Sequence, residues 1–105
     1  MNVVPGNLRS LRHRADQSAL DRAALVFSSL SNPVRLAVLL RLIEREWSVN
    51  EMASDLAISQ SALSQHLAKL RQAGIVSSRR DRQAVFYHCS DGCVSRLLAE
   101  AGLMR

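Results

Sequence analysis

A chain of 105 residues with 48% apolar and 22% charged residues has the size and composition of one globular domain, which excludes a disordered chain, a collagen and a disulfide-rich miniprotein. No apolar run approaches the roughly 18 residues of a membrane span, and no secretory signal follows the N-terminal arginines, so we expect a cytoplasmic protein. Fourteen basic residues against nine acidic ones give a net charge of +5, which favours a nucleic acid, a membrane surface or an acidic partner unless it serves solubility alone.

The N-terminal part divides into an arm and a first helix. Residues 1–15 show no sustained periodicity and are predicted to form a flexible basic arm, so that the folded domain spans residues 16–105. A helical pattern begins at Asp16 and ends near Ser31. Its apolar face contains Leu20, Ala23, Ala24, Phe27 and Leu30.

Two capping signals introduce the next helices. The Asn-Pro pair at 32–33 predicts a helix over Val34 to Glu46, because asparagine caps helices well and proline suits the first helical position. Apolar residues on two sides make this helix central, and Trp47 is expected to anchor its end in the core. The stretch Ser-Val-Asn-Glu at 48–51 has the spacing of a capping box, which predicts a short helix that ends near Leu56.

A fourth helix follows a tight connection at residues 57–58. Ser59 is its predicted cap, and Gly74 is placed to end it in the left-handed conformation after about Ala73. Its buried stripe consists of Leu63, Leu67 and Leu70. Small side chains with hydroxyl or amide groups dominate the other face, which contains Ser61, Ser64, Gln65 and Ala68, with Gln60 at the border.

The C-terminal part predicts a hairpin and a last helix. Strand-like runs at Ile75–Arg79 and Ala84–Cys89 flank the stretch Arg-Asp-Arg-Gln at 80–83, which would form a basic tip. Ser90-Asp91 then caps a final helix with an apolar face of Val94, Leu97, Leu98 and Ala101. The fold class is therefore mainly α with a β-hairpin, in the order α-α-α-α-β-β-α.

The third and fourth predicted helices have the form of a helix-turn-helix unit, a short helix joined by a tight turn to a second one. The major groove of B-form DNA is about 12 Å wide and admits one helix, whose exposed face must be slim and rich in donors and acceptors. The serine and glutamine face of the fourth helix meets that demand. On the hairpin, Arg79, Arg80 and Arg82 could lie along phosphates or enter a minor groove.

Three segments of the chain resemble a known family. Asn-Pro-Val-Arg-Leu at 32–36, Ser-Gln-Ser-Ala-Leu-Ser-Gln-His-Leu-Ala-Lys-Leu-Arg at 59–71 and Arg-Arg-Asp-Arg-Gln-Ala-Val-Phe-Tyr at 79–87 are similar to ArsR-type (ArsR/SmtB) winged helix-turn-helix repressors. They are most similar to the branch of nodulation regulators and redox-responsive repressors, over most of the chain. The resemblance implies a homodimer formed by the first and last helices, an inverted-repeat operator in double-stranded DNA, and repression relieved by a signal.

The resemblance also implies which residues bind DNA. It makes residues 59–69 the recognition helix and residues 75–89 the wing, and it places Arg35 close to the DNA backbone. The last helix is short for this family, so the first helix is expected to carry most of the dimer contact. The predicted DNA-binding residues are Arg35, Ser59, Gln60, Ser61, Ser64, Gln65, Lys69, Arg79, Arg80 and Arg82.

The metal sites of the family are incomplete in this sequence. Its metal sensors carry two cysteines just before an Asp-Leu pair, but Met-Ala-Ser precedes Asp55-Leu56 here. A second family site needs Asp-x-His early in the last helix and further ligands later, and Asp91-x-Cys93 matches only its first half. We therefore predict no metal site and no cofactor.

Two cysteines remain as candidates for redox or ligand sensing, Cys89 and Cys93. Redox-sensing relatives pair one cysteine of the second helix with one of the last helix, and this second helix has none. Cys89 shares a strand face with Tyr87 and is predicted to be a small buried side chain. Cys93 lies in the first turn after Asp91, where backbone N–H groups favour the thiolate, so it is the more reactive candidate. Either could instead be an ordinary thiol without a sensing role.

Other classes of function fit the sequence less well. No nucleophile with an orienting base and no glycine-rich phosphate loop occurs, so we predict that the protein is not an enzyme. The basic residues are spread along the chain, which argues against a membrane-bound helix. The alternative to a DNA-binding regulator is a winged-helix module for protein interaction. The slim polar face argues against it, because docking surfaces are enriched in large aromatic anchors.

Overall fold

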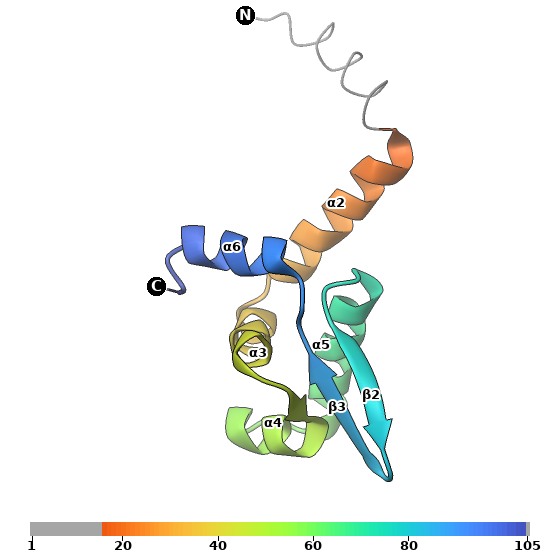
Figure 1. Cartoon of the computed structure of the whole chain (residues 1–105), viewed down its shortest axis with the longest axis vertical. Helices are drawn as coiled ribbons and strands as arrows, with labels where there is room; N and C mark the ends of the chain where they lie inside the picture. Colours follow the sequence, from red (N-terminus) through yellow and green to blue (C-terminus); the bar gives the residue numbers. More distant parts are fainter. Residues whose placement is uncertain (1–15, 105) are drawn as a thin grey trace, which may run out of the picture.

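The computed structural model describes residues 16–104 (Figure 1). The predicted arm at 1–15 and the last residue, Arg105, lie outside the described residues. Within them the chain forms five helices and three strands. In chain order these are α2 (Gln17–Leu30), α3 (Pro33–Glu44), β1 (Trp47–Ser48), α4 (Val49–Leu56), α5 (Gln60–Gln72), β2 (Ser77–Asp81), β3 (Ala84–His88) and α6 (Gly92–Glu100).

Side-chain caps begin the helices at the predicted residues. The side-chain oxygen of Asn32 accepts hydrogen bonds from the backbone N–H groups of Val34 and Arg35, at 2.9 and 3.1 Å. Ser48 and Glu51 form a complete capping box at the start of α4. Each cap satisfies backbone N–H groups that have no partner inside the helix, and these helix starts are therefore confirmed. The other caps are Asp16, Ser59 and Asp91.

The connection between α4 and α5 depends on one left-handed residue. Ala57 has a φ of 56°, and its backbone N–H donates to the carbonyl groups of Ala53 and Ser54. A left-handed alanine costs about 1–2 kcal/mol, so the surrounding packing must hold it. Ile58 packs against the core immediately after it, which fixes the angle between the two helices. The predicted tight turn is confirmed.

The hydrophobic core lies between α3, α5 and the elements that cover them. Burying one leucine-sized side chain contributes about 1.5–3 kcal/mol, so the leucine stripe is enough to hold α5 in place. That stripe is buried as predicted, which leaves the opposite face of α5 free. The two residues before β2, predicted as strand, are part of the core. Its members are Val38, Leu39, Leu42, Met52, Ala53, Leu63, Leu67, Leu70, Ile75, Val76, Val94 and Leu98.

The sheet has three strands, in the order β1-β3-β2, rather than the two of the predicted hairpin. The helix α3 ends at Glu44, not at Glu46, and the chain becomes extended at Arg45, which has a φ of −165°. It then forms β1, antiparallel to β3, with Trp47 opposite Tyr87. The sequence analysis extended the helix over these residues and missed β1, because the strand that pairs with β1 lies far away in the sequence.

The wing hairpin turns more tightly than predicted. Asp81 lies opposite Ala84 in the antiparallel pair β2–β3, so the turn contains only Arg82 and Gln83. Arg80 belongs to β2 and not to the tip. The predicted tip of four residues was therefore wrong by two residues, although the hairpin itself is confirmed.

The apolar face predicted for α2 is left uncovered by this chain. In Figure 1, α2 extends away from the body of the molecule, with α6 beside its C-terminal end. Phe27 is 61% exposed and Leu20 is 40% exposed, whereas Leu30 at the end of the helix packs against the core. The predicted apolar face is therefore present, and its outer part stays open to another surface.

Among residues 16–104, no single helix is long and apolar enough to cross a bilayer, although α2 and α3 together, bent by 96°, match such a span in length and composition. No group of three His, Cys, Asp or Glu side chains among residues 16–104 could hold a metal ion.

Candidate nucleic-acid interface

The helix α5 presents a slim polar face away from the core. The helix contains no acidic residue, so no charge on it repels a phosphate backbone. Its outer side chains are short or end in amide groups, as entry into a major groove requires. The exposed residues of this face are Gln60, Ser61, Ser64, Gln65 and Ala68, as predicted.

Ser59 and Lys69 stand at the two ends of this helix. The Ser59 hydroxyl oxygen accepts a hydrogen bond from the backbone N–H of Ala62 at 3.0 Å, so its first role is to begin the helix. Lys69 is exposed in the last turn beside Arg71. Contacts of Ser59 and Lys69 with DNA stay predictions.

Two arginines of the wing are free to meet an anion. Arg80 and Arg82 are exposed, and neither forms an ion pair within residues 16–104. Arg82 has a φ of 60° at the first position of the turn, where glycine is the usual residue. The turn thus has arginine at a position whose backbone conformation favours glycine.

Arg79, the third predicted wing contact, is bound to another residue of this chain. Its guanidinium donates two hydrogen bonds to the carboxylate of Glu46, at 2.8 and 2.6 Å, and lies 4.8 Å from the ring centre of Phe86. A bidentate pair of this kind fixes geometry as well as charge. Arg79 therefore ties the wing to the segment between α3 and β1, and Glu46 neutralises its charge. No local sequence pattern marks Glu46 for this role.

We expect Glu46→Gln to lower the melting temperature at neutral pH, with a difference from wild type that disappears in acid. The Arg79 guanidinium holds the pKa of Glu46 below its ordinary value near 4.5. As pH falls, the unfolded carboxyl takes up its proton first, so the stabilisation is lost between that ordinary value and the lower native one. Thermal melts by circular dichroism across this range measure the effect.

Glu44, the last residue of α3 and two residues before Glu46, provides a control for this prediction. Glu44 is exposed and forms no ion pair within the described residues, so Glu44→Gln should leave the melts unchanged. A Glu46→Gln difference that stays constant down to strongly acidic pH would show that the carboxylate charge does not stabilise the wing.

Arg35 also has internal partners. Its Nε donates to the carbonyl oxygen of Ser29 at 2.7 Å, and a terminal nitrogen donates to that of Ser28 at 3.3 Å. Its other terminal nitrogen lies 3.4 Å from Nδ1 of His66, on α5. Arg35 thus joins the last turn of α2 to α5, and its contact with the DNA backbone stays a prediction.

The two cysteines differ in their surroundings. Cys89 follows β3 directly and packs against the core, and burial raises the pKa of its thiol above the ordinary range. Cys93 is exposed in the first turn of α6, where its backbone N–H donates to Asp91 at 2.8 Å. Both are free thiols. Cys89 was predicted to be a small buried side chain, and the structure leaves it only partly buried. A sensing role for either cysteine stays a prediction.

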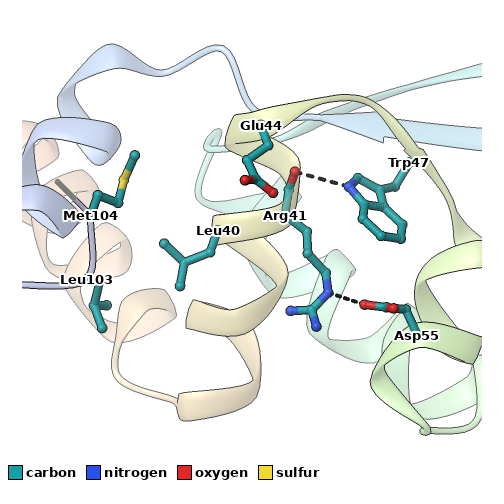
Figure 2. A pocket seen from close by; sticks show the side chains of 7 residues that line it. All are labelled: Leu40, Arg41, Glu44, Trp47, Asp55, Leu103 and Met104. Atoms are coloured by element: carbon teal, nitrogen blue, oxygen red, sulfur yellow. Dashed lines mark hydrogen bonds and ion pairs between the residues drawn. The ribbon is translucent and has the colours of Figure 1, made fainter.

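A hollow of about 550 Å³ lies between the end of α3, α4 and the C-terminal segment, and Figure 2 shows the side chains that line it. The Arg41 guanidinium donates to Asp55 at 2.7 Å, and the Arg41 carbonyl oxygen accepts from the Trp47 indole at 3.1 Å. The indole bond ties Trp47 to the end of α3, and Trp47 packs against the core, as predicted. The residues that line the hollow bear no hydroxyl, thiol or imidazole.

The chain matches a family model and curated relatives. The model described as "Bacterial regulatory protein, arsR family" matches residues 32–78. The nodulation protein NolR of Rhizobium meliloti is 45% identical over 72% of this chain and 62% of its own length. The transcriptional activator HlyU of Vibrio cholerae is 43% identical over 93% of this chain and 89% of its own length. The chain thus spans less than two thirds of NolR but most of HlyU.

Solved structures agree with this match. The crystal structure of NolR from Sinorhizobium fredii has a TM-score of 0.74 at 40% identity, over 80% of this chain and 84% of the chain in that crystal. The homodimeric winged helix-turn-helix DNA-binding domain Mb0332 of Mycobacterium bovis has a TM-score of 0.75 at 30% identity, over 85% of this chain and 84% of that one. With the fold and these relatives together, the chain belongs to the arsR family of bacterial regulatory proteins.

Proposed function

We propose that this protein is a cytoplasmic homodimeric repressor that binds an inverted-repeat DNA operator. In this proposal α5 enters the major groove and the wing lies along the backbone. The observation that carries it is the acid-free face of serines and glutamines on α5, beside a wing whose Arg80 and Arg82 are exposed and unpaired within the described residues. Phosphate contacts would then supply most of the affinity, and α5 would choose the sequence.

The proposed dimer is supported by the uncovered face of α2. A phenylalanine that is 61% exposed and a leucine that is 40% exposed lie on one side of this projecting helix, at positions 27 and 20. Leu103, just after α6, is also exposed. A second copy of the chain offers the same surfaces and would cover them. Dimers of helix-turn-helix proteins read two half-sites about one helical turn apart, which matches an inverted repeat.

A protein-interaction module is the rival function. Surfaces that dock proteins are enriched in aromatic and arginine anchors that fill pockets of the partner. The outer face of α5 has no aromatic residue and no leucine, and the one arginine of this helix, Arg71, lies in its last turn. These observations favour DNA over a protein partner for this face.

The test of the proposal is a change on α5. Gln65→Ala should reduce the preference for a duplex that the wild-type protein selects from a random library, relative to a scrambled duplex at equal salt. The expected loss is about 1–3 kcal/mol for each contacted base pair, because a glutamine amide pairs with adenine in bidentate fashion. Fluorescence anisotropy titrations of both duplexes measure the ratio.

The matched control is Gln72→Ala, which removes an exposed amide at the other end of α5. It should leave the preference unchanged. Equal binding of selected and scrambled duplexes by the wild-type protein would contradict sequence-specific recognition.

The same titration after treatment with a polysulfide tests sensing at Cys89 and Cys93, because a sensor loses operator binding on oxidation.

A further inference from the structure

A second hollow, of about 280 Å³, lies between the first turn of α4, the recognition helix and the wing strand β3. Asn50 comes from α4, Gln60 and Ser64 come from α5, and Gln83 and Tyr87 come from the turn and the strand. None of the residues that line the hollow is charged. Three separate elements thus bring neutral polar side chains to one place.

Five of the six polar side chains that line this hollow have no hydrogen-bond partner inside the described structure. Within residues 16–104, no hydrogen bond engages the side chains of Asn50, Gln60, Ser64, Gln83 or Tyr87. The hydroxyl of Ser48, the sixth polar lining residue, already accepts a capping bond from the backbone N–H of Glu51. The hydroxyl of Ser59, at the start of α5, likewise caps its own helix. Five amide and hydroxyl groups therefore remain available to one ligand.

The size of the hollow indicates what it can hold. At about 30 Å³ for each water, it has room for roughly nine water molecules. Pockets for small molecules usually begin at about 300 Å³ and are mostly apolar, whereas this lining is rich in amides and hydroxyls. One unit of a polymer that passes between α5 and the wing fits better than a whole effector molecule.

We propose that this hollow binds one phosphodiester group of the DNA backbone through neutral donors, with Asn50, Gln83 and Tyr87 as contacts beyond the recognition helix. The proposal rests on the proposed function. Serine, asparagine, glutamine and tyrosine side chains commonly donate to phosphate oxygens and fix the register of a protein on the duplex. If α5 lies in the major groove, the DNA strand that runs between α5 and the wing would pass over this hollow.

A neutral contact has a signature that a basic contact lacks. The dependence of log Kd on log salt counts the phosphates that Lys or Arg neutralise, at about 0.9 for each. Amide and hydroxyl donors strengthen binding without releasing counterions. Loss of these donors should therefore weaken binding at every salt concentration without changing the slope.

The first experiment measures binding of a selected duplex by anisotropy over a series of salt concentrations. Tyr87→Phe and the pair Asn50→Ala with Gln83→Ala should each weaken binding about tenfold, with the wild-type slope. Arg80→Gln should instead lower the slope, and Gln72→Ala should change neither quantity. Tyr87→Phe keeps the aromatic ring, and Asn50 and Gln83 are exposed, so thermal melts should match wild type.

The second experiment identifies the phosphate. Neutral methylphosphonate groups replace one phosphate at a time along the duplex. At one position in each half-site, the wild-type protein should lose affinity while Tyr87→Phe loses little more, because the contact is already absent. At all other positions the two losses should add, as they do for independent sites.

Several results would overturn the proposal. Wild-type affinity in both the Tyr87→Phe and the paired variants would show that the hollow does not contact DNA. A changed salt slope in these variants, or losses that add at every phosphate, would do the same. Because the wild-type protein would still prefer its selected duplex in those cases, the proposed function would stand. Absence of any duplex binding by the wild-type protein would instead refute both.

Discussion

Phe27→Glu should convert the protein from a dimer to a monomer and weaken its binding to a duplex with two half-sites by about 10²- to 10⁴-fold. Phe27 is 61% exposed on α2, so the substitution leaves the core of the protomer intact. At a dimer interface the new carboxylate would be buried without a partner, which is costly. A monomer binds a single half-site and loses the high effective concentration of the second domain.

Sedimentation equilibrium and anisotropy on the same samples measure this prediction. The variant should sediment with the mass of one chain, 11.6 kDa, and the wild-type protein with twice that mass. Ser18→Glu is the matched control: it adds the same carboxylate at an exposed site nine residues away, about two and a half turns along α2 and so on the opposite face. A Phe27→Glu protein that remains dimeric would place the dimer contact elsewhere.

The features that were predicted correctly depend on residues close together in the sequence. The cap of α3 joins Asn32 to Val34 and Arg35, and the capping box joins Ser48 to Glu51. The leucine stripe of α5 follows from a spacing of three and four residues along one helix. Short-range hydrogen bonds and helical periodicity can be recognised in a linear sequence, so the helix-turn-helix unit and its exposed face could be predicted.

The features that were missed depend on partners far apart in the chain. Trp47 pairs with Tyr87 in the sheet, and Arg79 binds Glu46, 33 residues before it. A strand of two residues has too short a pattern to be recognised, and only its partner strand makes it a strand. Arg79 was grouped with its neighbours because all three wing arginines look alike in sequence, whereas only the fold brings a carboxylate to one of them.

The helix α2 shows a different limit of prediction. Its periodicity correctly indicates an apolar face, but periodicity does not say which surface covers that face. In this protomer the outer part of the face is exposed to solvent, and this exposure supports the proposal that a second copy of the chain covers it. The same distinction applies to the hollow beside the wing, because its lining comes from α4, α5 and β3 and no single segment contains its pattern.

Arg80→Gln combined with Arg82→Gln should weaken binding to selected and scrambled duplexes alike. If four wing arginines of a dimer each neutralise one phosphate, the slope of log Kd against log salt should fall by roughly 3.6, at about 0.9 for each phosphate. The preference for the selected duplex should remain, because α5 is unchanged. Salt titrations of both duplexes measure slope and preference together. A lost preference with an unchanged slope would show that these arginines read bases.

The turn geometry allows the charge of Arg82 to be separated from the stability of the wing. Arg82 has a φ of 60°, which is unfavourable for arginine and easily adopted by glycine. Arg82→Gly should therefore keep or raise the melting temperature while it lowers the salt slope, and Arg82→Gln should lower the slope without relieving the strain. A lower melting temperature for Arg82→Gly than for wild type would mean that the arginine side chain stabilises the turn. Stability and DNA affinity changing in opposite directions would instead indicate that this strained position retains arginine for binding.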